Sequence, residues 1–96
     1  MLFLMSVNFT EQGIRNIKDS PKRAQAAKEL AKKCGCDMKE IYLTSGESDL
    51  MVMLETPNGD NVAKFALAVG SQGHVRTRTC RAWSLSEYTK IISELP

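Results

Sequence analysis

The chain of 96 residues contains a single histidine, three prolines and only 6% aromatic residues. It also lacks a strong charge of either sign, since the net charge is +2, and no block of like charges is long enough to form a tail. Charge alone therefore gives no reason to expect nucleic-acid or membrane binding. What the sequence does contain is 43% hydrophobic residues, enough for the core of one domain that spans residues 1–96.

A long hydrophobic run is missing as well. The apolar start at residues 1–5 has no basic leader, and Ser6 and Asn8 interrupt it too early for a signal peptide or a membrane span. The chain has three cysteines, and this odd number argues against a secreted disulfide framework. We therefore expect a cytoplasmic protein with reduced thiols and no membrane contact.

The clearest structural signal is the turn-rich segment at residues 44–50. Strand-forming residues end just before this segment and begin again inside it, and Gly46 and Asp49 tolerate turn geometry. The sequence therefore predicts a β-hairpin with strands over residues 38–44 and 49–56.

Two further strands are predicted by alternation. Residues 3–9 place Phe3, Met5, Val7 and Phe9 on one face, while Ser6 and Asn8 interrupt the other. Residues 75–83 are β-branched or polar in alternation and end in a tryptophan.

Three helices complete the expected pattern. Ser20 followed by Pro21 indicates the start of a helix over residues 21–33, which Gly35 ends. The helix at residues 62–69 is apolar all round except at Lys64, so we expect it to be covered on two sides, by the C-terminal segment or by another subunit. Ser84 with Glu87 predicts a capping box for a last helix, and Thr10 is expected to cap a short turn.

The predicted order is therefore βαββαβ with an extra C-terminal helix. This order is typical of an α+β, ferredoxin-like fold with an antiparallel four-stranded sheet. Such a sheet carries helices on one face only, and the apolar content of the strands favours packing of the open face on a second sheet. We expect a homodimer or a higher homo-oligomer.

Several segments together resemble the GYD family of small proteins. They are residues 10–23, Tyr42-Leu43-Thr44 with Gly46 and Asp49, residues 63–71, and Val75-Arg76-Thr77. The turn that corresponds to the Gly-Tyr-Asp motif is Gly46-Glu47-Ser48-Asp49, with serine where the tyrosine would stand. The resemblance implies a ferredoxin-like fold of the dimeric α+β barrel type and no established activity.

The cysteines and methionines are interpreted as structural. Cys34 and Cys36 are separated by one residue, which is not a common metal-binding spacing, and no histidine lies nearby. We expect no metal and no cofactor, and Cys80 is expected to be a small core residue.

The sequence offers few residues for proton transfer. His74 follows Gly73 in a loop, where an imidazole can act as a general base, and Tyr42 is the second catalytic candidate. No partner group is placed beside His74 by the sequence, so we interpret it as a solvated loop histidine.

A ligand site is predicted on the open sheet face, bordered by Asn8, Tyr42, Arg76 and Arg78. It would prefer a small anionic or carbonyl-bearing ligand. The alternative is that the arginines pair with Glu40, Asp49 or Glu55, across the sheet or between subunits.

Three functions remain open. The first is a small oligomeric binding or regulatory protein with a modest pocket on the open face. The second is a cofactor-free enzyme of the isomerase or monooxygenase type in the same pocket. The third is a weak nucleic-acid binder, which the sequence disfavours because Arg76 and Arg78 alternate with Arg81 and Trp83 onto opposite faces.

Overall fold

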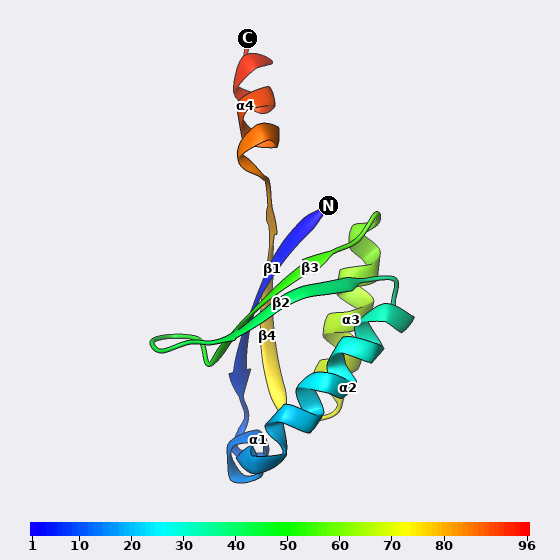
Figure 1. The fold of residues 1–96 in the computed structure, drawn as a ribbon, viewed down its shortest axis with the longest axis vertical. Coiled ribbons are helices and arrows are strands. Elements are labelled where there is room, and N and C mark those ends of the chain that lie inside the picture. Colours follow the sequence, from blue (N-terminus) through cyan, green and yellow to red (C-terminus); the bar gives the residue numbers. More distant parts are fainter.

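The computed structural model describes residues 1–96 and contains one antiparallel sheet with helices α2 and α3 on one face (Figure 1). The four strands lie in the order β2-β3-β1-β4. The elements are β1 (Leu2–Phe9), α1 (Glu11–Arg15), a 3-10 turn (Ile17–Asp19), α2 (Ser20–Lys33), β2 (Asp37–Leu43), β3 (Leu50–Glu55), α3 (Gly59–Ser71), β4 (Val75–Ala82) and α4 (Leu85–Ser93). The predicted ferredoxin-like α+β fold with an additional C-terminal helix is confirmed.

Alternation along the strands separates a helix-covered face from an open face. Met5 lies opposite Val52 of β3 and Thr79 of β4, and the Met5 and Val52 side chains are buried under the helices. The neighbouring residues of each strand point to the opposite side of the sheet. The core consists of Met5, Val7, Ala31, Cys36, Met38, Val52, Leu54, Val62 and Phe65.

The helix starts follow the predicted caps with one exception. The Thr10 hydroxyl accepts a hydrogen bond from the Gly13 amide at 3.1 Å, and Ser84 forms the predicted capping box with Glu87. Ser20, in contrast, is the first residue of α2 and not its cap. The preceding 3-10 turn leads directly into α2, so Ser20 already has helical backbone angles, φ −56° and ψ −41°.

The helix α3 begins earlier than its apolar run. Its cap is Asn58, whose side-chain oxygen accepts from the Asp60 amide at 3.0 Å. Val62 and Phe65 are buried, but Leu67 on the outer side is 76% exposed. The expected cover by the C-terminal segment is wrong for the single chain, because α4 projects beyond the end of the sheet and away from α3 (Figure 1).

The predicted hairpin joins β2 to β3, and hydrogen bonds hold its tip at the end of β1. The Thr44 amide donates to the Asp49 carbonyl at 2.9 Å, and Gly46 has a φ of +110° that favours glycine. Asp49 Oδ2 accepts from the Phe9 amide, and Asn8 Nδ2 donates to the Glu47 carbonyl, both at 2.8 Å. These contacts fix the position of the loop relative to the central strand.

Candidate functional site

The strand register places all four residues of the predicted ligand site on the open face. Asn8 lies directly opposite Arg76, and Ser6 lies opposite Arg78. On the other side of β1, Met51 lies opposite both Ser6 and Tyr42. Because directly paired residues share a face, these side chains line the surface away from the helices.

The polar groups on this open face differ in their partners. The Asn8 amide is engaged with the hairpin tip, whereas the guanidinium groups of Arg76 and Arg78 make no hydrogen bond or ion pair within the chain. The expected carboxylate partners within the chain are therefore absent. Asp49 binds the Phe9 amide, and Glu55 lies 3.9 Å from the Lys39 ammonium.

Cys80 also belongs to the open face, because it lies directly opposite Leu4. It is exposed, so the expectation of a core cysteine is wrong for the single chain. Cys36 is buried beneath the helices, and burial raises the pKa of its thiol. The chain brings no three His, Cys, Asp or Glu side chains together as a metal site.

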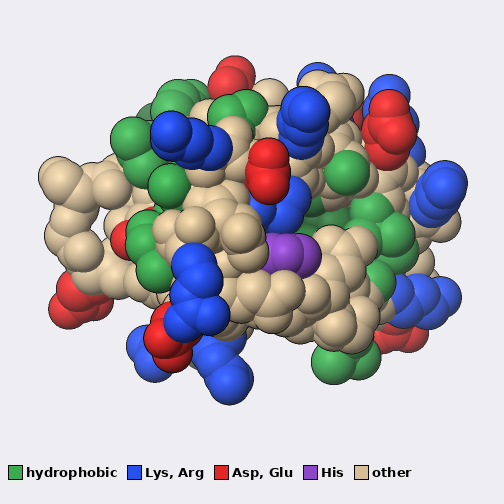
Figure 2. All heavy atoms as spheres, turned by 90° about the horizontal axis from the view of Figure 1, so that it is seen from below, with side chains coloured by type: hydrophobic (Ala, Val, Ile, Leu, Met, Phe, Trp, Pro, Cys, Tyr) green, Lys and Arg blue, Asp and Glu red, His purple; other side chains and the backbone are tan.

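A cavity of about 60 Å³ lies on the other side of the sheet, beneath α2 and α3. Its walls are mostly hydrophobic and include Met5, Ala27, Phe65 and Val69. His74 also lines the cavity and is visible at the surface at the α1 end of the molecule, beside hydrophobic side chains (Figure 2). The cavity therefore opens beside an imidazole.

The position of His74 is set by the turn that follows β1. Its carbonyl accepts from the Thr10 amide at 3.0 Å, and the Gly73 carbonyl accepts from the Thr10 hydroxyl at 2.7 Å. Gly13 packs so closely on the His74 carbonyl that a Cβ atom would clash with it. The N-terminus of α1 thus holds the His74 backbone against the sheet.

His74 lies in a loop, as predicted, but the residue is half-buried and is not fully solvated. Its Nδ1 atom is buried and has no hydrogen-bond partner, while Nε2 lies 3.5 Å from Gln12 Nε2. The reason is that α1 packs against residues 73 and 74, so this loop residue forms part of the cavity wall.

Arg23 of α2 lines the same cavity. Its Nη1 donates to the Asn16 carbonyl at 2.9 Å and its Nη2 to the Gly13 carbonyl at 3.1 Å. The guanidinium is therefore held in place by two neutral carbonyl groups, and no carboxylate of the chain forms an ion pair with it. In the sequence, Arg23 is only one of several basic side chains around the start of α2, so no specific signal pointed to it.

The two catalytic candidates lie on opposite faces of the sheet. Tyr42 projects from the open face, whereas His74 lines the cavity under the helices. They do not form one proton-transfer pair. Any site uses one of them without the other.

None of the four helices combines the length and the apolar content needed to cross a membrane. A comparison with curated proteins finds no match to the chain. A scan against protein-family models matches the GYD domain over residues 3–92, nearly the whole length. The chain, with its four-stranded antiparallel sheet and tied hairpin, belongs to the GYD domain family.

Proposed function

We propose that the protein binds a small, largely apolar molecule in the cavity beneath α2 and α3, and that His74 recognises the one polar group of this ligand. The observation that carries the proposal is the buried Nδ1 atom of His74, which has no partner in the chain. An unsatisfied buried polar atom costs about 1–3 kcal/mol, so a ligand that supplies its hydrogen bond gains affinity. Apolar walls with few polar groups are typical of small-molecule sites.

The charge and size of the cavity narrow the ligand class. The fixed positive charge of Arg23 favours a carboxylate or a carbonyl oxygen. A volume of about 60 Å³ is well below the roughly 150 Å³ of a cavity that encloses a whole benzene ring. The cavity therefore takes the polar end of a ligand and a short apolar part, and a larger ligand extends through the opening beside His74.

Binding is favoured over catalysis because His74 has no acid–base partner. Gln12, its neighbour across 3.5 Å, does not titrate. A cofactor-free isomerase or monooxygenase in this cavity would need His74 to act without an orienting carboxylate. We retain this enzyme as the alternative, and turnover of a bound compound would establish it.

Thermal-shift and calorimetric screening with benzoate, benzamide and toluene tests the proposal. Benzoate and benzamide share the ring with toluene but add an oxygen that His74 and Arg23 can bind. We expect benzoate to raise the melting temperature by mass action, and toluene to do so less. In His74→Phe, which keeps an aromatic ring without nitrogen, the advantage of benzoate over toluene should decrease to the part that Arg23 supplies.

Arg78→Ala is the matched control, because Arg78 lies on the open face. Loss of benzoate binding in Arg78→Ala with retention in His74→Phe would overturn the cavity proposal. That result would favour the second candidate site, the open face with Asn8, Tyr42, Arg76 and Arg78. The unpaired guanidinium groups of Arg76 and Arg78 are the specific support for this second site.

We also propose that two copies cover each other's open face. The proposed location is the reducing cytoplasm, where three free thiols stay reduced. An apolar strip crosses this face, flanked by Arg76 and Arg78 on β4, by Glu40 on β2 and by Glu55 at the end of β3. Such a face is self-complementary under a two-fold axis. The apolar strip consists of Leu2, Leu4, Tyr42, Met51 and Met53.

Cys80 provides a probe of this pairing, since it is exposed on the open face of the single chain. We expect its reaction with a thiol reagent to slow as protein concentration rises through the range where sedimentation shows dimers. A reaction rate that does not change with concentration would contradict pairing through this face.

Salt-sensitive binding of oligonucleotides would instead support the third function, a weak nucleic-acid binder.

A further inference from the structure

The C-terminal helix α4 carries an apolar stripe that is exposed along its length. No residue of α4 is buried, and Leu85 is 78% exposed. At about 100° per residue the apolar side chains fall within about 120° of the helix circumference. The stripe consists of Leu85, Tyr88, Ile91 and Ile92, and the exposed Leu95 follows just beyond the end of the helix.

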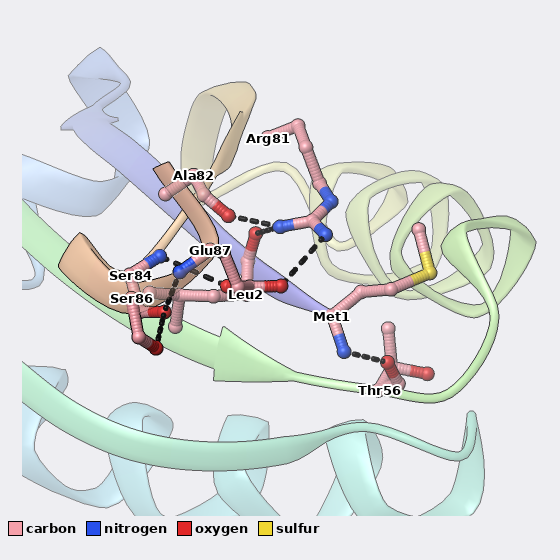
Figure 3. Close-up of polar contacts among 8 residues, drawn as sticks. All are labelled: Met1, Leu2, Thr56, Arg81, Ala82, Ser84, Ser86 and Glu87. Carbon is pink, nitrogen blue, oxygen red and sulfur yellow. Dashed lines mark hydrogen bonds and ion pairs between the residues drawn. The ribbon is translucent and has the colours of Figure 1, made fainter. Parts of the chain in front are cut away.

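The start of α4 is anchored by Arg81 (Figure 3). Its Nη1 donates to the Leu2 carbonyl at 3.2 Å and to the Ala82 carbonyl, and its Nη2 lies 3.7 Å from Glu87 Oε2. The capping box between Ser84 and Glu87 fixes the first turn. These contacts direct α4 away from the sheet, so its stripe does not reach its own core (Figure 1).

An exposed helix of this length requires a partner surface. Isolated helices shorter than about 12–15 residues are marginal in water, and α4 has nine. A membrane surface is disfavoured because α4 and its last residues carry two glutamates and one lysine, whereas surface-bound helices are rich in basic residues. The partner surface is therefore expected to be protein.

The chain itself offers a matching apolar surface at the hairpin. Leu43 is 81% exposed and Ile41 is 39% exposed. Both lie on the helix-covered face of β2, at the edge of the sheet, and Ile41 also lines the cavity. An arm that reaches them therefore passes over the β2 edge from the paired open face. The hairpin projects beyond the helices in a different direction from α4 (Figure 1). The charges also match, since Glu47 at the tip and Lys90 on α4 are exposed and have no ion pair in the chain.

We propose that α4 is an exchanged arm that packs its apolar stripe on Ile41 and Leu43 of a second copy. The proposal rests on the pairing of two copies proposed above and names the elements that complete it. A two-fold axis makes the contact twice, so both arms and both hairpins are covered. The two arm contacts add to the sheet contact toward the roughly 800 Å² per partner of a standard interface.

Hydrogen exchange of the α4 amides, followed by mass spectrometry over a range of concentrations, tests the proposal. We expect protection of α4 to increase with concentration, together with the dimer fraction from sedimentation. Leu43→Glu on the hairpin and Ile91→Glu on the arm should each remove this protection. Each should also raise the dimer dissociation constant by roughly 100-fold, because a carboxylate is buried in an apolar contact.

Matched controls place a charge beside each contact. Ser86→Glu on the polar side of α4 and Ser45→Glu in the hairpin loop should leave both measurements unchanged. The double variant Leu43→Glu, Ile91→Glu should be little worse than either single variant if the two residues meet.

Two results would overturn the arm while leaving the pairing intact. One is a dimer in which α4 exchanges freely at all concentrations. The other is a dimer in which Leu43→Glu leaves α4 protected. Protection independent of concentration would show that α4 packs on its own chain, and a monomer at all concentrations would contradict both the arm and the pairing.

Discussion

The Arg81 guanidinium lies over the Trp83 ring, with its Cζ atom 4.7 Å from the ring centroid. The same group also lies 5.8 Å from the centroid of the Phe3 ring, and it donates to the Leu2 carbonyl. A single partly buried side chain therefore connects β1, the end of β4 and the start of α4. Its contacts combine stacking with hydrogen bonding, which a lysine does not reproduce.

Replacing Arg81 should therefore lower stability. We expect Arg81→Ala to reduce the free energy of unfolding by about 1–2 kcal/mol, through loss of the stacked cation and its hydrogen bonds. Urea denaturation measures this change. Arg15→Ala, which breaks only the exposed pair with Glu11, is the control and should stay within about 0.5 kcal/mol of the wild type. Equal effects in the two variants would show that the stacked arrangement adds no stability.

Gly13 should not tolerate a side chain. In Gly13→Ala the new Cβ meets the His74 carbonyl, a backbone atom that cannot move without shifting the start of β4. We expect a loss of about 1–3 kcal/mol, as for an overpacked site. The altered His74 position should also weaken ligand binding in the cavity.

Gly70→Ala is the matched control, since a Cβ there meets no atom within 4 Å. Because Gly70 lies in α3, alanine should raise stability by about 0.5–1 kcal/mol. Chemical denaturation of both variants measures the difference. A neutral Gly13→Ala would refute the close approach of α1 to residue 74.

The alternation of the strands, the caps and the hairpin turn were enough to predict the fold. These signals are local, and they agree with the final topology. The expected coverage of α3 by the C-terminal segment failed because Arg81 just before α4 bonds the Leu2 carbonyl at the start of β1, a contact between distant residues that periodicity does not encode.

The candidate site could be predicted only in part. Asn8, Tyr42, Arg76 and Arg78 share a face because strand alternation determines which side a residue occupies. The cavity beside His74 was missed, because it depends on the packing of α1 on a loop. The only sequence signal was a pair of glycines, Gly13 before α2 and Gly73 after α3. Glycines at these places allow the backbone segments beside the cavity to approach each other closely.

Cys36 should make the protein less stable in alkaline solution. Burial raises the pKa of the Cys36 thiol above its usual range, with a smaller opposing effect of the Thr56 hydrogen bond. The unfolded thiol ionises first, so stability is complete below the unfolded pKa and decreases as the pH rises toward the folded pKa. Urea denaturation between about pH 7 and 10.5 should show this decrease, and Cys36→Ala should flatten it. An unchanged slope in Cys36→Ala would assign the effect to another group.

Protonation of Glu87 at low pH should destabilise the first turn of α4. Hydrogen bonds from the Ser84 backbone and then from its side chain lower the pKa of Glu87, with a smaller contribution from Arg81. A lowered folded pKa stabilises the helix start above the unfolded pKa, and this stabilisation is lost as the pH falls through the folded pKa. NMR titration of the Glu87 carboxyl and the α4 amides measures both changes. In Glu87→Gln the amide shifts should no longer follow that titration, and persistence of the transition would exclude Glu87 as its origin.

The central position of β1 has a consequence for the order of folding. Its two neighbours are β3 and β4, so the first strand of the chain is completed only when residues 75–82 are available. Before that point one edge of β1 exposes unpaired N–H and C=O groups, which can pair with another chain. The sheet therefore closes late and through non-local contacts, which slow folding. The nascent protein is most exposed to aggregation just before its last strand is made.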